Sequence, residues 1–151
     1  MKATLLLQKD HEKVRELFGK IRGAKSAAHN GNRALFEEIR REITAHSHIE
    51  TEIFYPALVE TTSKRAEELV AAARDDHEKI DKLLSELSTT GTSDKGFESK
   101  LNRLIESVNA HIDQEEEDIF AEARSAFSEQ RLEELGLEME ERRRMLTQVA
   151  A

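Results

Sequence analysis

The order of apolar and polar residues follows the 3.6-residue period of amphipathic helices in five stretches of the chain. The pattern predicts helices over about residues 4–22, 33–56, 64–87 and 97–125, with a shorter fifth helix over about 128–148. Helices of this length joined by short segments are typical of an up-down-up-down four-helix bundle. We therefore expect an all-α fold with one additional C-terminal helix.

Local signals place the ends of these helices. Residues 23–32 should form a loop, because Asn30-Gly31-Asn32 has the composition of a turn. Pro56 should end or kink the second helix, since proline lacks a backbone N–H. Thr61 to Ser63 offer an N-cap for the third helix, residues 88–96 read as a linker, and Gly136 is a weak point in the fifth helix.

Polar residues interrupt the apolar face of each of the first four helices. A single buried histidine is explained by a hydrogen-bond partner in the core. Four such histidines together with two inward carboxylates are not, because an unpaired buried charge is too costly to keep. The pattern therefore predicts a metal site, and its candidate ligands are His11, His46, Glu50, His77, His111 and Glu115.

The second helix offers two pairs of histidine and glutamate four residues apart, a spacing that puts both side chains about 40° apart on one face. His46 and Glu50 fall in line with the apolar residues, whereas His48 and Glu52 align with polar positions and are expected to face solvent. The acidic run from Glu116 to Asp118 is likewise expected to be a solvated face.

The four histidines recur at intervals of 35, 31 and 34 residues, which fits one crossing of the same level by each helix of an up-down bundle. The second and fourth helices run in the same direction, so Glu50 and Glu115 should lie at one level and can bridge two metal ions. Four nitrogens and four oxygens supply about four contacts per ion. An oxo or hydroxo bridge adds a fifth and leaves a sixth position for an exogenous ligand.

Composition narrows the function. The 151 residues are expected to form a single domain, with the bundle over about 4–125. The chain has no cysteine, which excludes thiolate ligands and disulfides, and imidazole with carboxylate suits iron, with manganese or zinc as alternatives. A net charge of -8 disfavours nucleic acid as a partner. No apolar segment predicts a signal peptide or a membrane span, so we expect a cytoplasmic protein.

The fifth helix is interpreted as a cap or as a surface for a protein partner or self-association. Its basic cluster, Arg142 to Arg144, follows several glutamates, and charge pairs within the helix are sufficient to explain it.

Four segments together resemble the hemerythrin-like (HHE cation-binding) domain family, and the resemblance spans residues 4–146. The segments are residues 10–18, 46–56, 76–81 and 111–120. The resemblance implies a four-helix bundle with a non-haem di-iron centre that is bridged by two carboxylates and capped by histidines. Carried over position by position, it implies the same six ligands. Ferritin-like proteins place glutamate before histidine at a spacing of three, which does not match this chain.

One departure from the family pattern bears on function. Oxygen-carrying hemerythrins have a further histidine one turn before the position of His77, where this chain has Ala73. The vacancy leaves an additional open site or one filled by water, His29 or a nearby carboxylate, and it counts against reversible oxygen carriage. The sequence leaves open whether His29, His48 or Tyr55 takes part in the site.

Three functional hypotheses follow. The first is a di-iron protein that binds oxygen, peroxide or nitric oxide for sensing, storage or scavenging. The second is an enzyme that turns over peroxide or nitric oxide at the same centre, with Tyr55 as a source of a proton or an electron. The third is an iron-responsive interaction module in which metal loading orders the bundle. A metal-free bundle with buried histidines is the remaining alternative.

Overall fold

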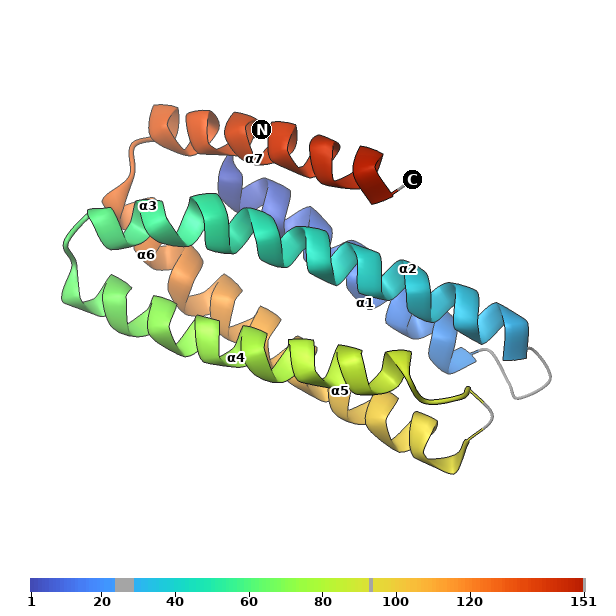
Figure 1. Cartoon of the computed structure of the whole chain (residues 1–151). Helices are drawn as coiled ribbons and strands as arrows, with labels where there is room; N and C mark the ends of the chain where they lie inside the picture. Colours follow the sequence, from blue (N-terminus) through green and yellow to red (C-terminus); the bar gives the residue numbers. More distant parts are fainter. Residues whose placement is uncertain (24–28, 93, 151) are drawn as a thin grey trace.

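The computed structural model describes residues 1–23, 29–92 and 94–150, and the regular structure within these ranges is entirely helical. Four antiparallel columns of helix form a bundle, and the last helix of the chain lies outside it (Figure 1). The columns are α1 (Ala3–Gly23); α2 (His29–Ile49) continued by η1 (Glu50–Phe54) and α3 (Tyr55–Glu60); α4 (Lys64–Ser88); and α5 (Lys95–Gln114) continued by η2 (Glu115–Ile119) and α6 (Phe120–Ala126). The predicted all-α bundle is confirmed.

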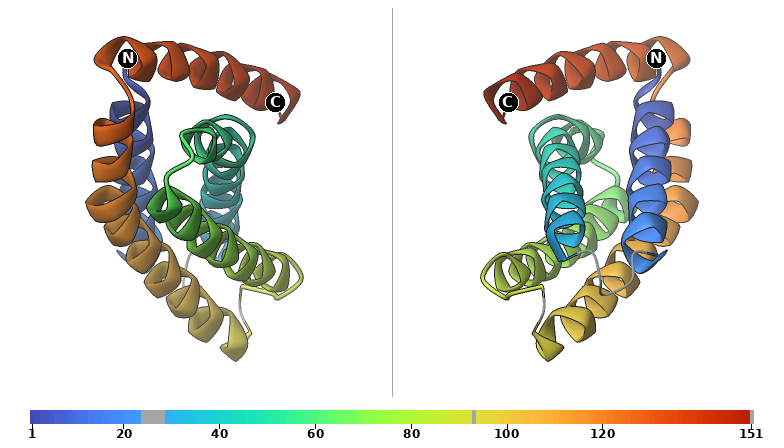
Figure 2. Two further views of the ribbon diagram at one scale, coloured as in Figure 1. Left: turned by 90° about the vertical axis from the view of Figure 1, so that its left-hand side faces the viewer. Right: turned by 90° about the vertical axis from the view of Figure 1, so that its right-hand side faces the viewer.

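Helix α7 (Glu129–Ala150) lies across one side of the bundle, and the N-terminus of the chain is close to its first turns (Figure 2). With 22 residues it is shorter than α4, which has 25, and about as long as α1, which has 21, and it lies where the additional C-terminal helix was predicted. Gly136 does not interrupt it.

The predicted start of the second helix is wrong, and of the two alternatives predicted at Pro56, an end of the helix is excluded. Helix α2 begins at His29, so Asn30 to Asn32 belong to its first turn. Asn and Gly are tolerated there, because the first N–H groups of a helix have no partner within the helix. The rest of the predicted loop, residues 24–28, lies outside the described residues. Pro56 does not end the second column, because it stands in the first turn of α3, where a missing N–H costs little, and the helix continues to Glu60.

The N-cap predicted between Thr61 and Ser63 is confirmed at Ser63. Its backbone is extended, and its Oγ accepts a hydrogen bond of 3.2 Å from the N–H of Ala66. This cap fixes the start of α4 and therefore the level at which the residues of α4 enter the core.

The core consists of two apolar clusters, one at each end of the bundle. The first cluster joins the N-terminal halves of α1 and α4 with η1, α3, α6 and α7, and it includes Leu7, Phe54 and Met139. The second joins the C-terminal halves of α1 and α4 with α2 and α5 toward the opposite end, and it includes Phe36 and Leu104. Between the two clusters lies a layer of buried polar side chains, most of them histidine or carboxylate. The fold thus encloses a polar centre between two apolar halves.

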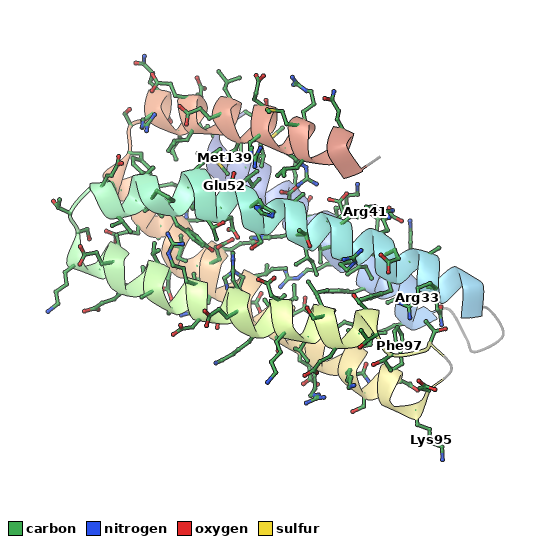
Figure 3. The ribbon with its side chains drawn as sticks, viewed as in Figure 1. Arg33, Arg41, Glu52, Lys95, Phe97 and Met139 are labelled. Atoms are coloured by element: carbon green, nitrogen blue, oxygen red, sulfur yellow. The ribbon has the colours of Figure 1, made fainter. Side chains whose placement is uncertain are left out.

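Helix α7 packs on α1, α2 and η1. Met139 is fully buried on its inner face, and Glu52 lies at the same interface, as Figure 3 shows. Glu52 accepts two hydrogen bonds from Arg142, with Nε at 2.7 Å and Nη2 at 3.3 Å. The interpretation of the basic cluster as pairs within the helix is therefore wrong for Arg142, whose partner belongs to another element.

None of the helices within the described residues is long and apolar enough to span a membrane.

Candidate metal centre

The structure brings the six predicted site residues together in the polar layer. Each histidine comes from a different column of the bundle, and each carboxylate begins a π-helical turn on the second or the fourth column. Glu50 and Glu115 are fully buried, and His11, His77 and His111 are buried with 3%, 8% and 6% exposure. The similar spacing of the histidines along the chain thus corresponds to one level of the bundle.

Two groups of potential ligands can be distinguished. In the first group, His11 Nε2 lies 3.0 Å from Glu115 Oε1, and His46 Nε2 lies 3.1 Å from Glu50 Oε1. The two Nε2 atoms are 3.2 Å apart. The donor atoms of His11, His46, Glu50 and Glu115 all lie within 4.8 Å of one another, which is the compactness that a single metal ion requires.

The second group consists of Glu50, His77 and His111. His77 Nε2 lies 3.2 Å from Glu50 Oε1, and His111 Nε2 lies 3.5 Å from Glu115 Oε2. Glu115 therefore presents Oε1 to the first group and Oε2 to the second, while Glu50 Oε1 lies between His46 and His77. Both carboxylates stand between the two groups, as bridging ligands would.

Several potential metal-ligating atoms of this layer have no hydrogen-bond partner. Among the described residues, the buried side-chain atoms without one are both oxygens of Glu50, Glu115 Oε1, His111 Nε2 and Asn32 Oδ1. All but the last belong to the candidate site. Unsatisfied buried carboxylate oxygens are costly unless a cation is nearby, and imidazole with carboxylate is a donor set that suits iron, manganese or zinc. The residues present therefore fit a metal centre.

The outward nitrogen, Nδ1, of each histidine contacts a polar residue of another helix, at 2.8 to 3.1 Å. An acceptor at Nδ1 fixes the ring and leaves Nε2 free to bind a metal. The pairs form a closed ring around the bundle: Asp10 of α1 with His46, Ser47 of α2 with His77, Asp76 of α4 with His111, and Glu116 of η2 with His11.

Sequence reasoning missed these four partners. Each one adjoins a candidate ligand in the chain but contacts a histidine on a neighbouring helix, so the pattern within one helix does not reveal it. Glu116 was expected on a solvated face, which is wrong, because its side chain is 30% exposed and contacts His11 Nδ1 at 2.8 Å. The available signal was the dipeptide Asp-His, which occurs at residues 10–11 and again at 76–77.

The two π-helical turns begin at Glu50 and Glu115. In each turn the N–H five residues later, that of Tyr55 or Phe120, donates to the carbonyl of the glutamate. In an α-helix the fifth residue would lie roughly 140° around the axis from the glutamate, whereas the wider turn brings it toward the same face. Tyr55 and Phe120 are consequently buried beside the site, and the ring of Phe120 stacks on His11 at 5.9 Å between centroids.

Tyr55 is the residue that the structure places beside His77, on the side where Ala73 offers no ligand. Its hydroxyl donates a short hydrogen bond to Glu115 Oε2 and lies 3.3 Å from His77 Nε2. Burial and the nearby carboxylates of Glu115 and Glu50 raise the pKa of Tyr55 well above its ordinary value. A protonated phenol oxygen therefore stands within reach of the second group of ligands.

His48 does not join the cluster. His48 is 47% exposed, and its Nδ1 lies 3.2 Å from Glu52, so the expectation that this pair faces solvent is met. The side chain of His29 lies outside the described residues.

Proton positions in the site are set by its two buried carboxylates. Burial lowers the pKa of His46, but Glu50, Asp10 and Glu115 outweigh it and raise that pKa well above its ordinary value. Burial also lowers the pKa of His111, but the carboxylates of Glu115, Glu50 and Asp76 outweigh it and raise that pKa to about 9. Burial raises the pKa of Glu115, but its contacts with Glu50 and three histidines lower it well below the ordinary value. Without a metal, the centre therefore favours protons on His46 and His111.

A small cavity of about 30 Å³ adjoins the site, large enough for about two water-sized molecules. The four histidines and aliphatic residues such as Val14 and Val108 line it. Ser47, His77 and Asp81 line both this cavity and a groove on the surface between α2 and α4. The cavity is therefore of a size for a small molecule, and it shares three lining side chains with the groove at the surface.

Comparisons with known proteins agree with this geometry. A hemerythrin HHE cation-binding domain-containing protein from Mycobacterium kansasii has the same fold, with a TM-score of 0.86 and 30% identity, over 99% of this chain and 90% of that protein. A protein named DNA nickase from Nostoc sp. (strain PCC 7120) is 26% identical over 133 residues. That alignment covers 88% of this chain but only 36% of the Nostoc protein, so the chain spans about a third of that relative.

The sequence model of the hemerythrin HHE cation-binding domain matches residues 3–123, the part of the chain that contains the four candidate histidines and both buried glutamates of the site. Helix α7 lies beyond this match. The protein is therefore a member of the hemerythrin HHE cation-binding domain family.

Proposed function

We propose that this protein binds two iron ions, bridged by Glu50 and Glu115, and that the adjoining cavity receives dioxygen, peroxide or nitric oxide. The observation that carries the proposal is the division of the Glu115 carboxylate between two histidine groups, with Oε1 facing His11 and Oε2 facing His111. Two iron ions would supply the open coordination position and the electrons for such a ligand.

The residues around the ions have distinct roles in this proposal. His11 and His46 hold one ion, and His77 and His111 hold the other. Each imidazole is fixed by the contact between its Nδ1 and a polar residue of a neighbouring helix. The aliphatic residues of the cavity exclude bulk water from the bound ligand.

Metal analysis of protein purified without chelators tests the stoichiometry. We expect close to two iron ions per chain in the wild type. Glu50→Gln keeps the size of the side chain but removes the charge, and we expect it to retain at most one ion, since both groups use Glu50. Glu117→Gln is the matched control, because Glu117 is an exposed acid of η2, and it should retain two. A wild type that takes up no iron, manganese or zinc would refute the proposal.

Tyr55 favours a second candidate function, enzymatic turnover of peroxide. The reaction converts two molecules of hydrogen peroxide into one of dioxygen and two of water, and it requires a group that passes protons. The Tyr55 hydroxyl is buried and is hydrogen-bonded to Glu115 Oε2, so it can hold a proton at the edge of the site. Continuous consumption of peroxide indicates turnover, whereas one equivalent consumed per centre indicates binding alone.

The name of the Nostoc relative does not lead us to propose action on DNA. A net charge of -8 disfavours contact with phosphates, and the aligned segment is about a third of that protein.

A further inference from the structure

We propose that α7 is a working part of the metal centre, because Arg143 positions Asp10, which in turn holds the candidate ligand His46. This inference rests on the proposed binding of metal at His46. It assigns a role to a helix that lies outside the match to the family.

The contacts run in an unbroken line from α7 to the site. Arg143 Nη1 lies 3.1 Å from Asp10 Oδ2, and the same oxygen lies 2.9 Å from His46 Nδ1. His46 Nε2 then faces Glu50 Oε1 at 3.1 Å. One carboxylate oxygen thus joins a residue of the C-terminal helix to a residue at the centre.

The surroundings make this a constrained contact and not a loose surface pair. Asp10 is 8% exposed, and the side chain of Arg143 is 20% exposed. The second guanidinium nitrogen of Arg143 binds Glu42 of α2, whose other oxygen accepts a hydrogen bond of 2.8 Å from Lys13 of α1. Arg143 is therefore held at both ends of its guanidinium, which fixes Asp10 between α1, α2 and α7.

The physical role of Arg143 follows from the charge of Asp10. A carboxylate at the outer nitrogen of a ligating histidine fixes the tautomer and the ring angle, and changes at such partners weaken metal binding by roughly 10- to 100-fold. Asp10 can do so only while its own orientation is fixed. Without Arg143, the carboxylate would be free to rotate toward solvent and the His46 ring would lose its support.

The neighbouring arginines offer matched controls. Arg142 also docks α7 on the bundle, but through Glu52, which does not contact a candidate ligand other than the exposed His48. Arg144 is exposed on the same helix. Arg142→Gln therefore tests docking in general, and Arg144→Gln tests the loss of a charge alone.

The experiment measures zinc affinity by chelator competition in the 151-residue protein, since zinc avoids changes of oxidation state. We expect Arg143→Gln to weaken binding by about tenfold and Asp10→Asn by at least as much. The double variant should be no weaker than Asp10→Asn alone, because Arg143 acts through Asp10. Arg142→Gln and Arg144→Gln should bind zinc as the wild type does, and the helix content of each metal-free variant shows whether it folds.

The same line of contacts must work in both directions, because coupling between two binding events is reciprocal. Zinc should slow hydrogen exchange of the α7 amides in the wild type and do so less in Arg143→Gln. If Arg143→Gln binds zinc as tightly as Arg144→Gln, or if Arg142→Gln weakens binding equally, the assignment to Arg143 is overturned. A wild type that binds no zinc or iron would instead count against the proposed function itself.

Discussion

Ala73 and the neighbouring Tyr55 distinguish the surroundings of His77 from the pattern of oxygen-carrying hemerythrins, in which a further histidine is expected. The carrier's additional histidine would stand one turn before His77, and Ala73 is small and apolar at that position. The phenol of Tyr55 lies beside His77 instead, with its proton directed at Glu115. In the proposed turnover of peroxide, this hydroxyl would supply a proton that an imidazole ligand at the position of Ala73 would not.

Tyr55→Phe tests this interpretation. All six candidate ligands remain in the variant, so we expect it to bind two iron ions. Loss of the hydroxyl should lower the steady-state rate of peroxide consumption by about 100-fold, the lower range for loss of a positioned acid or base. The measurement is peroxide consumption per iron over many turnovers, with Glu117→Gln as control. An unchanged rate with full iron content would remove Tyr55 from the mechanism.

At this scale the sequence predicts the candidate ligands but not their partners. A histidine or glutamate within an apolar face is visible because it breaks the period of one helix. Asp10, Ser47, Asp76 and Glu116 break no such period, and their contacts depend on how neighbouring helices are rotated and spaced. Arg143 was hidden for the same reason, because pairs within its own helix already offered a sufficient explanation.

At the scale of helices, the two π-helical turns are the feature that the apolar pattern does not predict. Extrapolating a constant α-helical period places Ile53 on the inner face and Tyr55 off it. In the structure Tyr55 is fully buried and Ile53 is only partly buried, since the wider turn rotates the residues after Glu50. The same turn after Glu115 buries Phe120 against His11. Helix type, number and approximate bounds could be predicted, whereas this local change of register could not.

Gly136 shows how closely α7 docks on the start of the chain. A Cβ built at this position would lie 1.8 Å from the carbonyl oxygen of Met1 and 3.0 Å from the backbone nitrogen of Ala3. Both neighbours are backbone atoms, which cannot move aside as a flexible side chain would. The glycine that the sequence suggested as a weak point is therefore the residue that permits the contact between α7 and the N-terminus.

We expect Gly136→Ala to lower the free energy of unfolding by about 1–3 kcal/mol, the usual cost of overpacking. Gly19→Ala is the matched control, because Gly19 is an exposed helical glycine with open space around its Cβ position. That control should raise the free energy of unfolding by roughly 0.5–1 kcal/mol through helix propensity. Urea titration of both variants measures the difference, and equal stabilisation by the two substitutions would contradict the close approach.

At the scale of the whole molecule, the fold buries two charged carboxylates between its two apolar clusters, which lowers the free energy of unfolding unless the charge is balanced. Glu50 and Glu115 are fully buried near one another, and their charge is balanced either by protonated histidines or by metal ions. Burial of the two apolar clusters stabilises the fold and offsets the unfavourable burial of these charges. Protons and metal ions should therefore compete for the same carboxylates, so that pH controls both metal affinity and the stability of the metal-free form.

The sign of this pH dependence follows from His111. Its pKa is about 9 in the folded protein and about 6.5 in an unfolded chain, so its contribution to stability is complete below pH 6.5 and is lost as the pH rises through 9. His46 acts in the same direction. Glu115, whose pKa is lowered, contributes above about pH 4.5 and loses its effect as the pH falls further. Metal-free protein should be most stable between these limits.

We expect metal-free protein to lose about 3 kcal/mol of unfolding free energy from His111 alone between pH 6.5 and a pH above 9. Zinc-loaded protein should not show this loss, because its histidines are bound as neutral imidazoles, and zinc affinity should rise over the same interval as fewer protons are displaced. Urea titrations at several pH values, with and without zinc, measure both effects. His111→Gln should reduce the loss in the metal-free protein to the part that His46 contributes, whereas His48→Gln, at an exposed position, should preserve the profile. A metal-free protein as stable at pH 9.5 as at pH 6.5 would show that the two buried carboxylates are not balanced by histidine protons.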